Sequence, residues 1–168
     1  MENKWLTIEK TGDSVILKKC SQESTGKIVI PECVTSIFSC AFSCCTGLTS
    51  IVIPDSVAYI GDGAFCGCTG LTSIEIPNSV KNISDGVFLH CTGLTSIVIP
   101  DSVTSIDNYA FWCCTSLNSI EIPSSVISIG SSAFSYCENL KSVTIPKATK
   151  MGNHSFAGCK QLEAIDYI

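Results

Sequence analysis

Arginine is absent from the 168 residues, and histidine occurs only twice. The formal net charge is −5, and between residues 28 and 140 one lysine faces nine acidic residues. Nucleic-acid affinity depends on Lys and Arg side chains that neutralise phosphates, so DNA and RNA are not expected partners. No apolar run approaches the roughly 18 residues that a membrane helix needs. The sequence therefore predicts no nucleic-acid binding and no membrane insertion.

Residues that could carry catalysis are also few. His90 beside Cys91, with Cys113 in a neighbouring repeat, has the residue types of a Cys/His dyad or a zinc site but not the paired ligand spacing. Asp62 and Asp85 hold equivalent positions in adjacent repeats, where either a bridging Ca²⁺ or two solvated turn acids would fit, and the second interpretation is favoured. The sequence thus predicts no catalytic residue, no metal site and no cofactor, so the protein is not expected to be an enzyme.

Proline, in contrast, is strictly periodic. Successive prolines are 23 residues apart, at Pro31, Pro54, Pro77, Pro100, Pro123 and Pro146. Leucine, phenylalanine and cysteine recur with nearly the same period, and one repeat has them at Leu48, Phe65 and Cys68. The equivalent residues of successive repeats are called a column below. A period of about 20–29 residues with a Leu-x-x-Ile-x-Ile core is typical of a leucine-rich solenoid, in which one short strand per repeat stacks into a parallel sheet.

Each repeat is predicted to form one coil of this solenoid. Ile51 and Ile53 alternate with Ser50 and Val52, the period-two pattern of a strand with one buried face. Pro54 has no amide hydrogen and is expected to end the strand. The recurring Ala-Phe pair is expected to fill the convex side through turns and short 3₁₀ segments. The predicted fold class is a leucine-rich-repeat solenoid, mostly β, with a curved parallel sheet on the concave face and very little helix.

The twelve cysteines would suggest a disulfide scaffold if they were not periodic. One column holds Cys45, Cys68, Cys91, Cys114, Cys137 and Cys159. Equivalent residues of adjacent coils lie about 4.8 Å apart with parallel side chains, whereas a disulfide needs Cβ atoms about 3.8 Å apart. Buried, reduced thiols are therefore predicted. The other six cysteines, Cys20 included, share no column apart from Cys44 and Cys113, and they are interpreted as incidental.

The first 24 residues break the period. Trp5–Ile8 and Val15–Leu17 flank a Gly-Asp-Ser turn signal, which predicts a β-hairpin that caps the first coil. Thr25 then takes the first position of the leucine column. The predicted domains are a capping hairpin at 1–24 and a solenoid of about six coils at 25–168.

The last coil stops as its strand finishes, which leaves Leu162, Ile165 and Tyr167 without a following coil. Two copies that meet end to end through this coil would bury these side chains. Four lysines near this end oppose a tight contact, so a weak homodimer is expected. Continuation of the solenoid in a longer protein is the alternative.

The segment Cys-Thr-Gly-Leu-Thr-Ser-Ile-Val-Ile-Pro-Asp-Ser-Val-Thr-Ser-Ile at 91–106, nearly repeated at 45–60, resembles the BspA-like leucine-rich repeats. The resemblance covers nearly the whole chain. It implies a non-enzymatic protein, exposed on the cell surface or secreted, that adheres to host extracellular matrix or to other cells. The first residues lack the basic head and apolar core of a signal peptide, so the cytoplasm stays open as a second location.

Binding is expected on the concave face, at the outward positions of the predicted strands. These positions are Ser50, Val52, Ser73, Glu75, Ser96, Val98, Ser119, Glu121, Ser142 and Thr144. One interpretation is a hydroxyl-lined groove in which Glu75 and Glu121 recognise a basic or extended partner. The other is that serine and threonine are simply good solvent-facing strand residues, kept by repeat duplication.

The residue types on this face indicate weak binding by a single copy. Interface hot spots are rich in Trp, Tyr and Arg, which the face lacks except at its C-terminal end, and multivalent display would raise the affinity. The predicted function is a protein-binding or adhesion module with a protein partner. The alternative is a structural or self-assembling surface-layer protein without a specific ligand.

Overall fold

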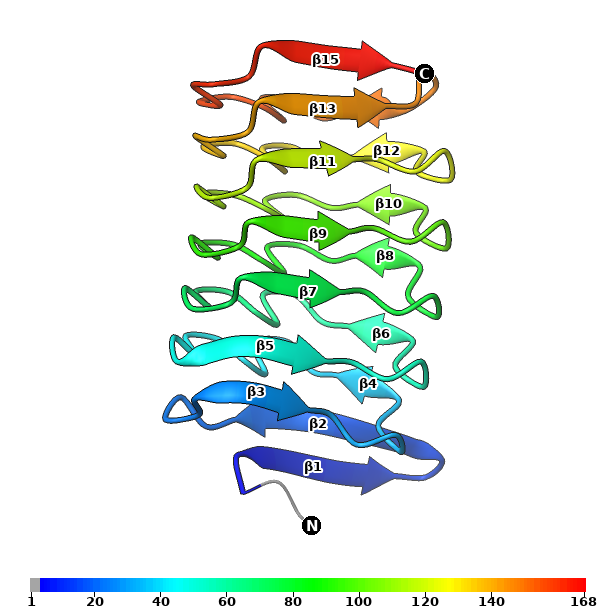
Figure 1. The fold of residues 1–168 in the computed structure, drawn as a ribbon. Helices are drawn as coiled ribbons and strands as arrows, with labels where there is room; N and C mark the ends of the chain where they lie inside the picture. Colours follow the sequence, from blue (N-terminus) through cyan, green and yellow to red (C-terminus); the bar gives the residue numbers. More distant parts are fainter. Residues whose placement is uncertain (1–3) are drawn as a thin grey trace.

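The structure is a computed structural model that describes residues 4–168. The chain winds through a stack of similar coils, with the N-terminal segment at one end of the stack and the C-terminus at the other (Figure 1). Every regular element is a β-strand, and no helix occurs within residues 4–168. These features confirm the predicted, mostly β solenoid.

One wall of the solenoid is formed by the longer strands, one from each coil, and is called the main sheet below (Figure 1). Its strands are β3 (Gly26–Val29), β5 (Leu48–Val52), β7 (Ser73–Glu75), β9 (Ser96–Val98), β11 (Ser119–Glu121), β13 (Ser142–Ile145) and β15 (Ala164–Tyr167). Their pairing is parallel and keeps the repeat register, so that Ser73 lies opposite Ser96 and Ile74 opposite Ile97. Hydrogen-bonded pairing falls into two blocks, β3-β5-β7-β9 and β11-β13-β15.

A second row of two-residue strands, whose pairing also falls into two blocks, lies on the opposite wall (Figure 1). Its strands are β4 (Ser36–Ile37), β6 (Tyr59–Ile60), β8 (Asn82–Ile83), β10 (Ser105–Ile106), β12 (Ser128–Ile129) and β14 (Lys150–Met151). In each coil the chain reverses after the proline, as shown by the 3.0 Å bond from the Val57 amide to the Pro54 carbonyl. Only two residues then run parallel to the next coil before the following turn, which explains the short strands.

The N-terminal segment forms the predicted hairpin, with β1 (Leu6–Thr11) antiparallel to β2 (Ser14–Cys20). Because β2 also pairs in parallel with β4, the hairpin covers the first coil. Trp5 is partly buried and packs against the core. Where the hairpin domain ends, predicted at residue 24, stays a prediction.

The assignment of Thr25 to the leucine column is wrong. Thr25 is exposed, and Ser24 is the fully buried residue at this point. The register shifts between Gly26 and Lys27 where β3 pairs with β5. Gly26 therefore lies opposite Leu48, the place that a strict 23-residue spacing gives to Thr25.

The convex wall is built from turns rather than from continuous 3₁₀ segments. The amides of Ala64 and Cys66 bond to carbonyls three residues earlier, at 3.1 and 2.9 Å. The amides of Phe65 and Gly67, in between, bond instead to the next coil, at 2.9 and 2.7 Å. Because every second amide leaves its own coil, a helix cannot propagate. Gly63 and Gly67 support this alternation with left-handed φ values of 60° and 70°.

Two side-chain columns fill the core behind this wall. The phenylalanine rings stack from coil to coil, with centroids 5.6 Å apart for Phe65 and Phe88 and 5.3 Å apart for Phe88 and Phe111. In the cysteine column each thiol from Cys68 onward donates to the phenylalanine carbonyl of the preceding coil, as in the 3.0 Å bond from Cys91 to Phe65. All twelve cysteines are free in the structure, and the column is buried except for the half-buried Cys159.

Candidate functional site

All ten residues predicted to bind a partner lie in strands β5 to β13 of the main sheet. Val52, Ser73, Glu75, Ser96, Val98, Ser119, Glu121 and Ser142 are exposed, and Ser50 and Thr144 are half-buried. The alternation is sharp: the side chain of Val98 is 69% exposed, whereas that of its neighbour Ile97 is 9% exposed. The predicted set therefore shares one continuous surface.

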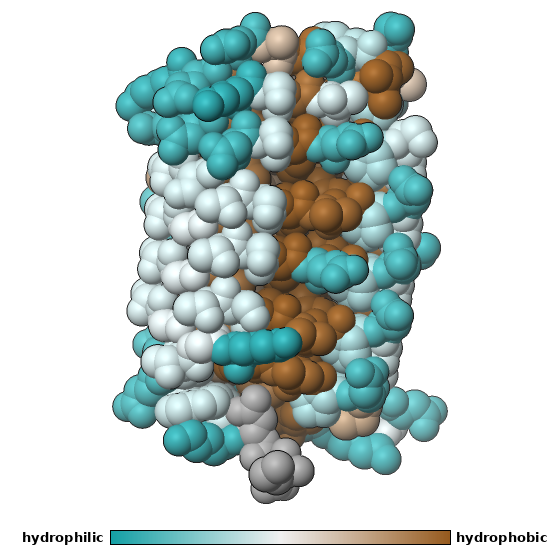
Figure 2. Space-filling view, in the orientation of Figure 1, coloured by the Kyte–Doolittle hydropathy of each residue, from teal (hydrophilic) through white to brown (hydrophobic). Residues whose placement is uncertain are grey.

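A hydrophobic stripe follows the coil axis along this surface (Figure 2). Its exposed members are the valines at the outward ends of the strands, Val29, Val52 and Val98. The stripe is hollowed in two places. One hollow of about 370 Å³ is bordered by Val52 and Pro54, and a larger one of about 550 Å³ by Val98 and Pro123. Both lie where the strands end and the chain turns.

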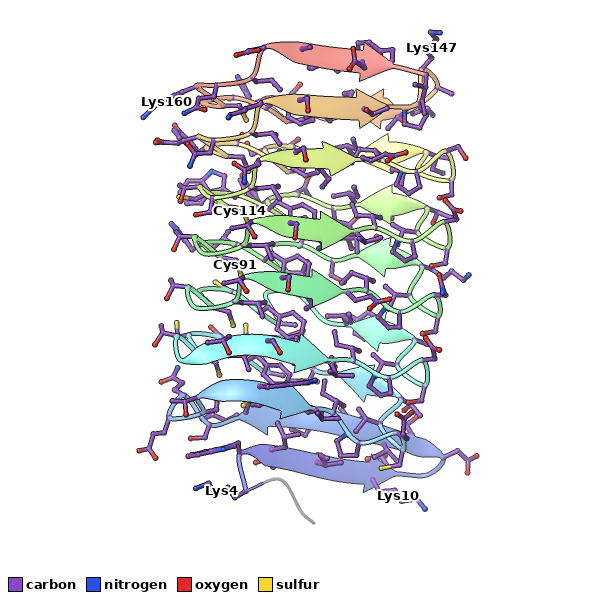
Figure 3. All side chains as sticks on the ribbon, viewed as in Figure 1. Lys4, Lys10, Cys91, Cys114, Lys147 and Lys160 are labelled. Atoms are coloured by element: carbon purple, nitrogen blue, oxygen red, sulfur yellow. The ribbon has the colours of Figure 1, made fainter. Side chains whose placement is uncertain are left out.

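Acidic side chains border both hollows. Glu32, Asp55 and Glu75 line the smaller one, and Asp101 and Glu121 line the larger one. No lysine is among the residues that line either hollow. The four labelled lysines in Figure 3 lie at the two ends of the stack, which agrees with the acidic middle of the sequence. We call this surface, with its valine stripe and acidic rim, the acidic groove.

The larger hollow coincides with the seam between the two blocks of the main sheet. Strands β9 and β11 are not paired as a ladder, and within the described residues the main-chain bond that joins them is the 3.5 Å contact from the Asn118 amide to the Thr95 carbonyl. Ser96 and Ser119 line the hollow on the two sides of this seam. The sequence carries no signal for the seam, because both strands have the same repeat pattern.

The threonines that directly precede the outward serines of the main sheet stabilise the stack of coils. The Thr95 hydroxyl donates to the Thr72 carbonyl at 3.0 Å, and the Thr72 hydroxyl lies 3.5 Å from the Thr49 carbonyl. These bonds brace neighbouring coils at the start of each strand. The threonine row therefore helps to hold the coils together. The acidic groove lies at the opposite ends of the strands, toward the prolines.

The Cys/His pair has no catalytic geometry. The buried Cys91 thiol donates to the Phe65 carbonyl at 3.0 Å, while His90 is exposed and packs edge-on against Trp112, with ring centroids 4.6 Å apart. Among residues 4–168, no three His, Cys, Asp or Glu side chains are grouped to hold a metal ion, Asp62 and Asp85 included. The same residues contain no helix that could cross a membrane.

Comparison with known proteins agrees with this architecture. Six copies of the BspA type leucine rich repeat region match residues 35–163. A leucine-rich repeat protein from T. pallidum has a similar structure, with a TM-score of 0.88 and 30% sequence identity over 99% of this chain and 81% of that one. A leucine-rich cell surface protein from Faecalibacterium prausnitzii gives a TM-score of 0.67 and 30% identity over 96% of this chain and 38% of that one. The curated proteins contain no significant match.

The fold and its outward face define a leucine-rich repeat solenoid, a class of extended recognition surfaces rather than of enclosed active sites. Within this class the chain belongs to the BspA-type leucine-rich repeat family. Members of this family are typically non-catalytic binding modules.

Proposed function

We propose that the chain is a non-enzymatic protein-binding or adhesion module that holds a protein partner in the acidic groove. The observation that carries this proposal is the continuity of the groove, in which apolar side chains and an acidic rim run across successive coils. Host extracellular matrix or another cell surface is the partner class that the family favours. A similar chain is described as a leucine-rich cell surface protein, which supports a cell-surface or secreted location.

The charge of the groove favours a basic, extended partner segment. Carboxylates recur along the rim about every 4.8 Å or a multiple of it, which is the spacing of parallel strands. An extended segment with alternating apolar and Lys or Arg side chains could contact the valine stripe and the rim together. Such contacts form on exposed surfaces and are each weak. Many copies on one surface would then provide the avidity that a single groove lacks.

The first test places arginines in the groove. In the double variant Ser96→Arg with Ser119→Arg, both long cationic side chains enter the larger hollow beside Asp101 and Glu121. We expect binding to purified, immobilised extracellular-matrix proteins to fall at least about tenfold, because bulk and positive charge are added where a basic segment would lie. Surface plasmon resonance of wild type and variant against the same panel measures the change.

The matched control is Thr104→Arg with Ile127→Arg. These two residues are exposed on the opposite wall, before β10 and β12, in the same two coils. Unchanged binding in this control and an unchanged thermal midpoint in both variants are expected. Loss of binding in the control alone would place the binding surface on the opposite wall.

A specific observation also favours the alternative function, self-assembly. Within residues 4–168 strand β15 pairs with β13 alone, and Met151, Tyr167 and Ile168 are exposed at this end of the stack. A second copy that meets this end would cover these side chains and give the weak, concentration-dependent homodimer expected from the sequence.

Light scattering over a wide concentration range, without any added partner, tests this association. The mean mass is expected to rise toward that of a dimer at high concentration, and Tyr167→Lys is expected to abolish the rise. A constant monomer mass in the wild type would remove the support for self-assembly and leave the adhesion proposal as it stands.

A further inference from the structure

The first thiol of the cysteine column differs from the others in its contacts. Cys68, Cys91, Cys114, Cys137 and Cys159 each donate to a phenylalanine carbonyl of the preceding coil, at 3.0 to 3.2 Å. Cys45 has no phenylalanine below it, because the hairpin places Cys20 there: the Cys20 amide bonds to the Ala41 carbonyl as the Phe42 amide bonds to the Ala64 carbonyl. The Cys45 sulfur lies 3.6 Å from the carbonyl oxygen of Ser21 instead.

Cys20, to which the sequence pattern assigned no role, lies beneath Cys45 in the core. Its side chain is 1% exposed, and its sulfur lies 3.6 Å from the same Ser21 carbonyl and 3.4 Å from the Ser24 hydroxyl. The two thiols therefore share the Ser21 carbonyl oxygen as a neighbour. The interpretation of Cys20 as incidental is therefore wrong: it closes the buried thiol column at the capping hairpin.

Cys20 and Cys45 are not equivalent residues of adjacent coils, so the spacing of about 4.8 Å that keeps the column cysteines from forming disulfides does not hold for them. Column cysteines are about 23 positions apart and point in parallel from adjacent coils. Cys20, in contrast, precedes Cys45 by 25 positions and lies at the end of β2. The two sulfurs each lie 3.6 Å from the same carbonyl oxygen, and a disulfide requires them to approach to about 2.05 Å from each other.

We propose that Cys20 and Cys45 are a redox site, at which oxidation forms a disulfide that fastens the capping hairpin to the first coil. The oxidant is a small-molecule disulfide. The Cys20 thiolate attacks one of its sulfurs and displaces a thiolate; Cys45 then loses its proton and attacks the Cys20 sulfur of the mixed disulfide, displacing the second thiolate. Both protein thiols are oxidised, and the small molecule is reduced to two thiols that take up the two protons.

The electrostatics of the pair support these roles. The hydrogen bond from Cys45 lowers the pKa of Cys20 to about 7 and the Ser24 hydroxyl acts in the same direction, against the effect of burial. The same hydrogen bond, with burial, raises the pKa of Cys45. Cys20 is therefore the thiol that supplies a nucleophile near neutral pH.

Access to the pair runs through the hairpin. Both sulfurs are buried, so the oxidant reaches them when the hairpin lifts from the first coil. The hairpin is held by the pairing of Ile16 with Ser36 and of Leu17 with Ile37, and by further bonds that include the one from the Cys20 amide to the Ala41 carbonyl at 2.6 Å. Once formed, the disulfide opposes this opening, and a solenoid frays from an uncapped end.

Peptide mapping after oxidation tests the proposal. To suppress surface reactions, the less buried cysteines Cys33, Cys40, Cys44, Cys66 and Cys113 are changed to serine. The folded variant is treated with oxidised glutathione, blocked with iodoacetamide and digested with trypsin. Cleavage after lysine leaves Cys20 as the single cysteine of peptide 20–27, and Cys45 in peptide 28–81 with Cys68.

A linked pair of these two peptides is expected, with fragmentation that places the bond on Cys45 and with loss of the link under dithiothreitol. The adjacent column pair Cys91 and Cys114, equally buried and on the same side of neighbouring coils (Figure 3), serves as the internal control and is expected to stay reduced. A Cys20 to Cys68 bond, absence of any bond to Cys20, or equal oxidation of Cys91 and Cys114 would each overturn the proposal.

Hydrogen exchange of the wild-type chain tests the fastening itself. Oxidation is expected to slow amide exchange in residues 6–20 at least about tenfold and to leave residues 96–121 unchanged. The variant Cys20→Ser is expected to show no such response to oxidised glutathione. Unchanged exchange in residues 6–20 of a chain that carries the bond would reject the fastening role.

Discussion

Replacing Phe88 by alanine is expected to lower the free energy of unfolding by about 3–5 kcal/mol. Phe88 is fully buried and stacks between Phe65 and Phe111, with ring centroids 5.6 and 5.3 Å away. The truncation removes a large apolar surface from the core and leaves a cavity that two fixed coils cannot close. Urea unfolding followed by circular dichroism measures the loss, and Phe111→Ala is expected to behave in the same way.

The matched control is Phe38→Ala, the same substitution at a ring that is 48% exposed. Phe38 contacts the Lys18 ammonium, 3.8 Å from the ring centre, but does not belong to the stacked column. Its replacement is expected to lower stability by about 1 kcal/mol or less. A loss below about 1 kcal/mol at Phe88 would contradict the assignment of the phenylalanine column to the core.

The fold could be predicted because the repeat period determines which residues superpose. Once Pro31 and Pro54 are equivalent, every buried column follows, and the period-two alternation around Ile51 orients the strand. The errors lie where the chain leaves the period. The register shift at Gly26 places Gly26, not Thr25, opposite Leu48, and Cys20 and Cys45, whose sulfurs lie near the same Ser21 carbonyl, are two residues that no repeat column relates.

The candidate site was predictable in one respect only. Alternation placed Ser96, Ser119 and their equivalents on an outward face, since side chains on a strand alternate between its two sides. The hollow between β9 and β11 depends on how closely two coils approach, and the approach of Asp101 to the same hollow depends on the path of the turn after Pro100. The repeat pattern is the same in both coils, so it predicts neither the distance between the two strands nor the path of this turn.

The stability of the chain is expected to fall steeply above pH 9, because the buried thiols of Cys68, Cys91, Cys114 and Cys137 ionise there only when the chain unfolds. Burial, and then the neighbouring thiols, raise the pKa of Cys68 from 9.0 to about 12 and raise the pKa values of Cys91, Cys114 and Cys137. A thiol with a raised folded-state pKa binds its proton more tightly in the folded chain. Its contribution is therefore complete below pH 9 and is lost as the pH rises toward the folded value.

From pH 8 to pH 10 each of these thiols is expected to remove roughly 1 kcal/mol from the free energy of unfolding, and the four together roughly 5 kcal/mol. Urea unfolding at a series of pH values, with reducing agent present, measures this slope. In the variant Cys91→Ala with Cys114→Ala two of the four protons no longer take part, so about half of the slope is expected to remain. A difference in stability between the variant and the wild type at pH 8 does not affect this test, since only the change in the free energy of unfolding with pH is compared. An unchanged slope would show that groups other than the buried column cause the alkaline loss, and that its thiols ionise as readily in the folded chain as in the unfolded one.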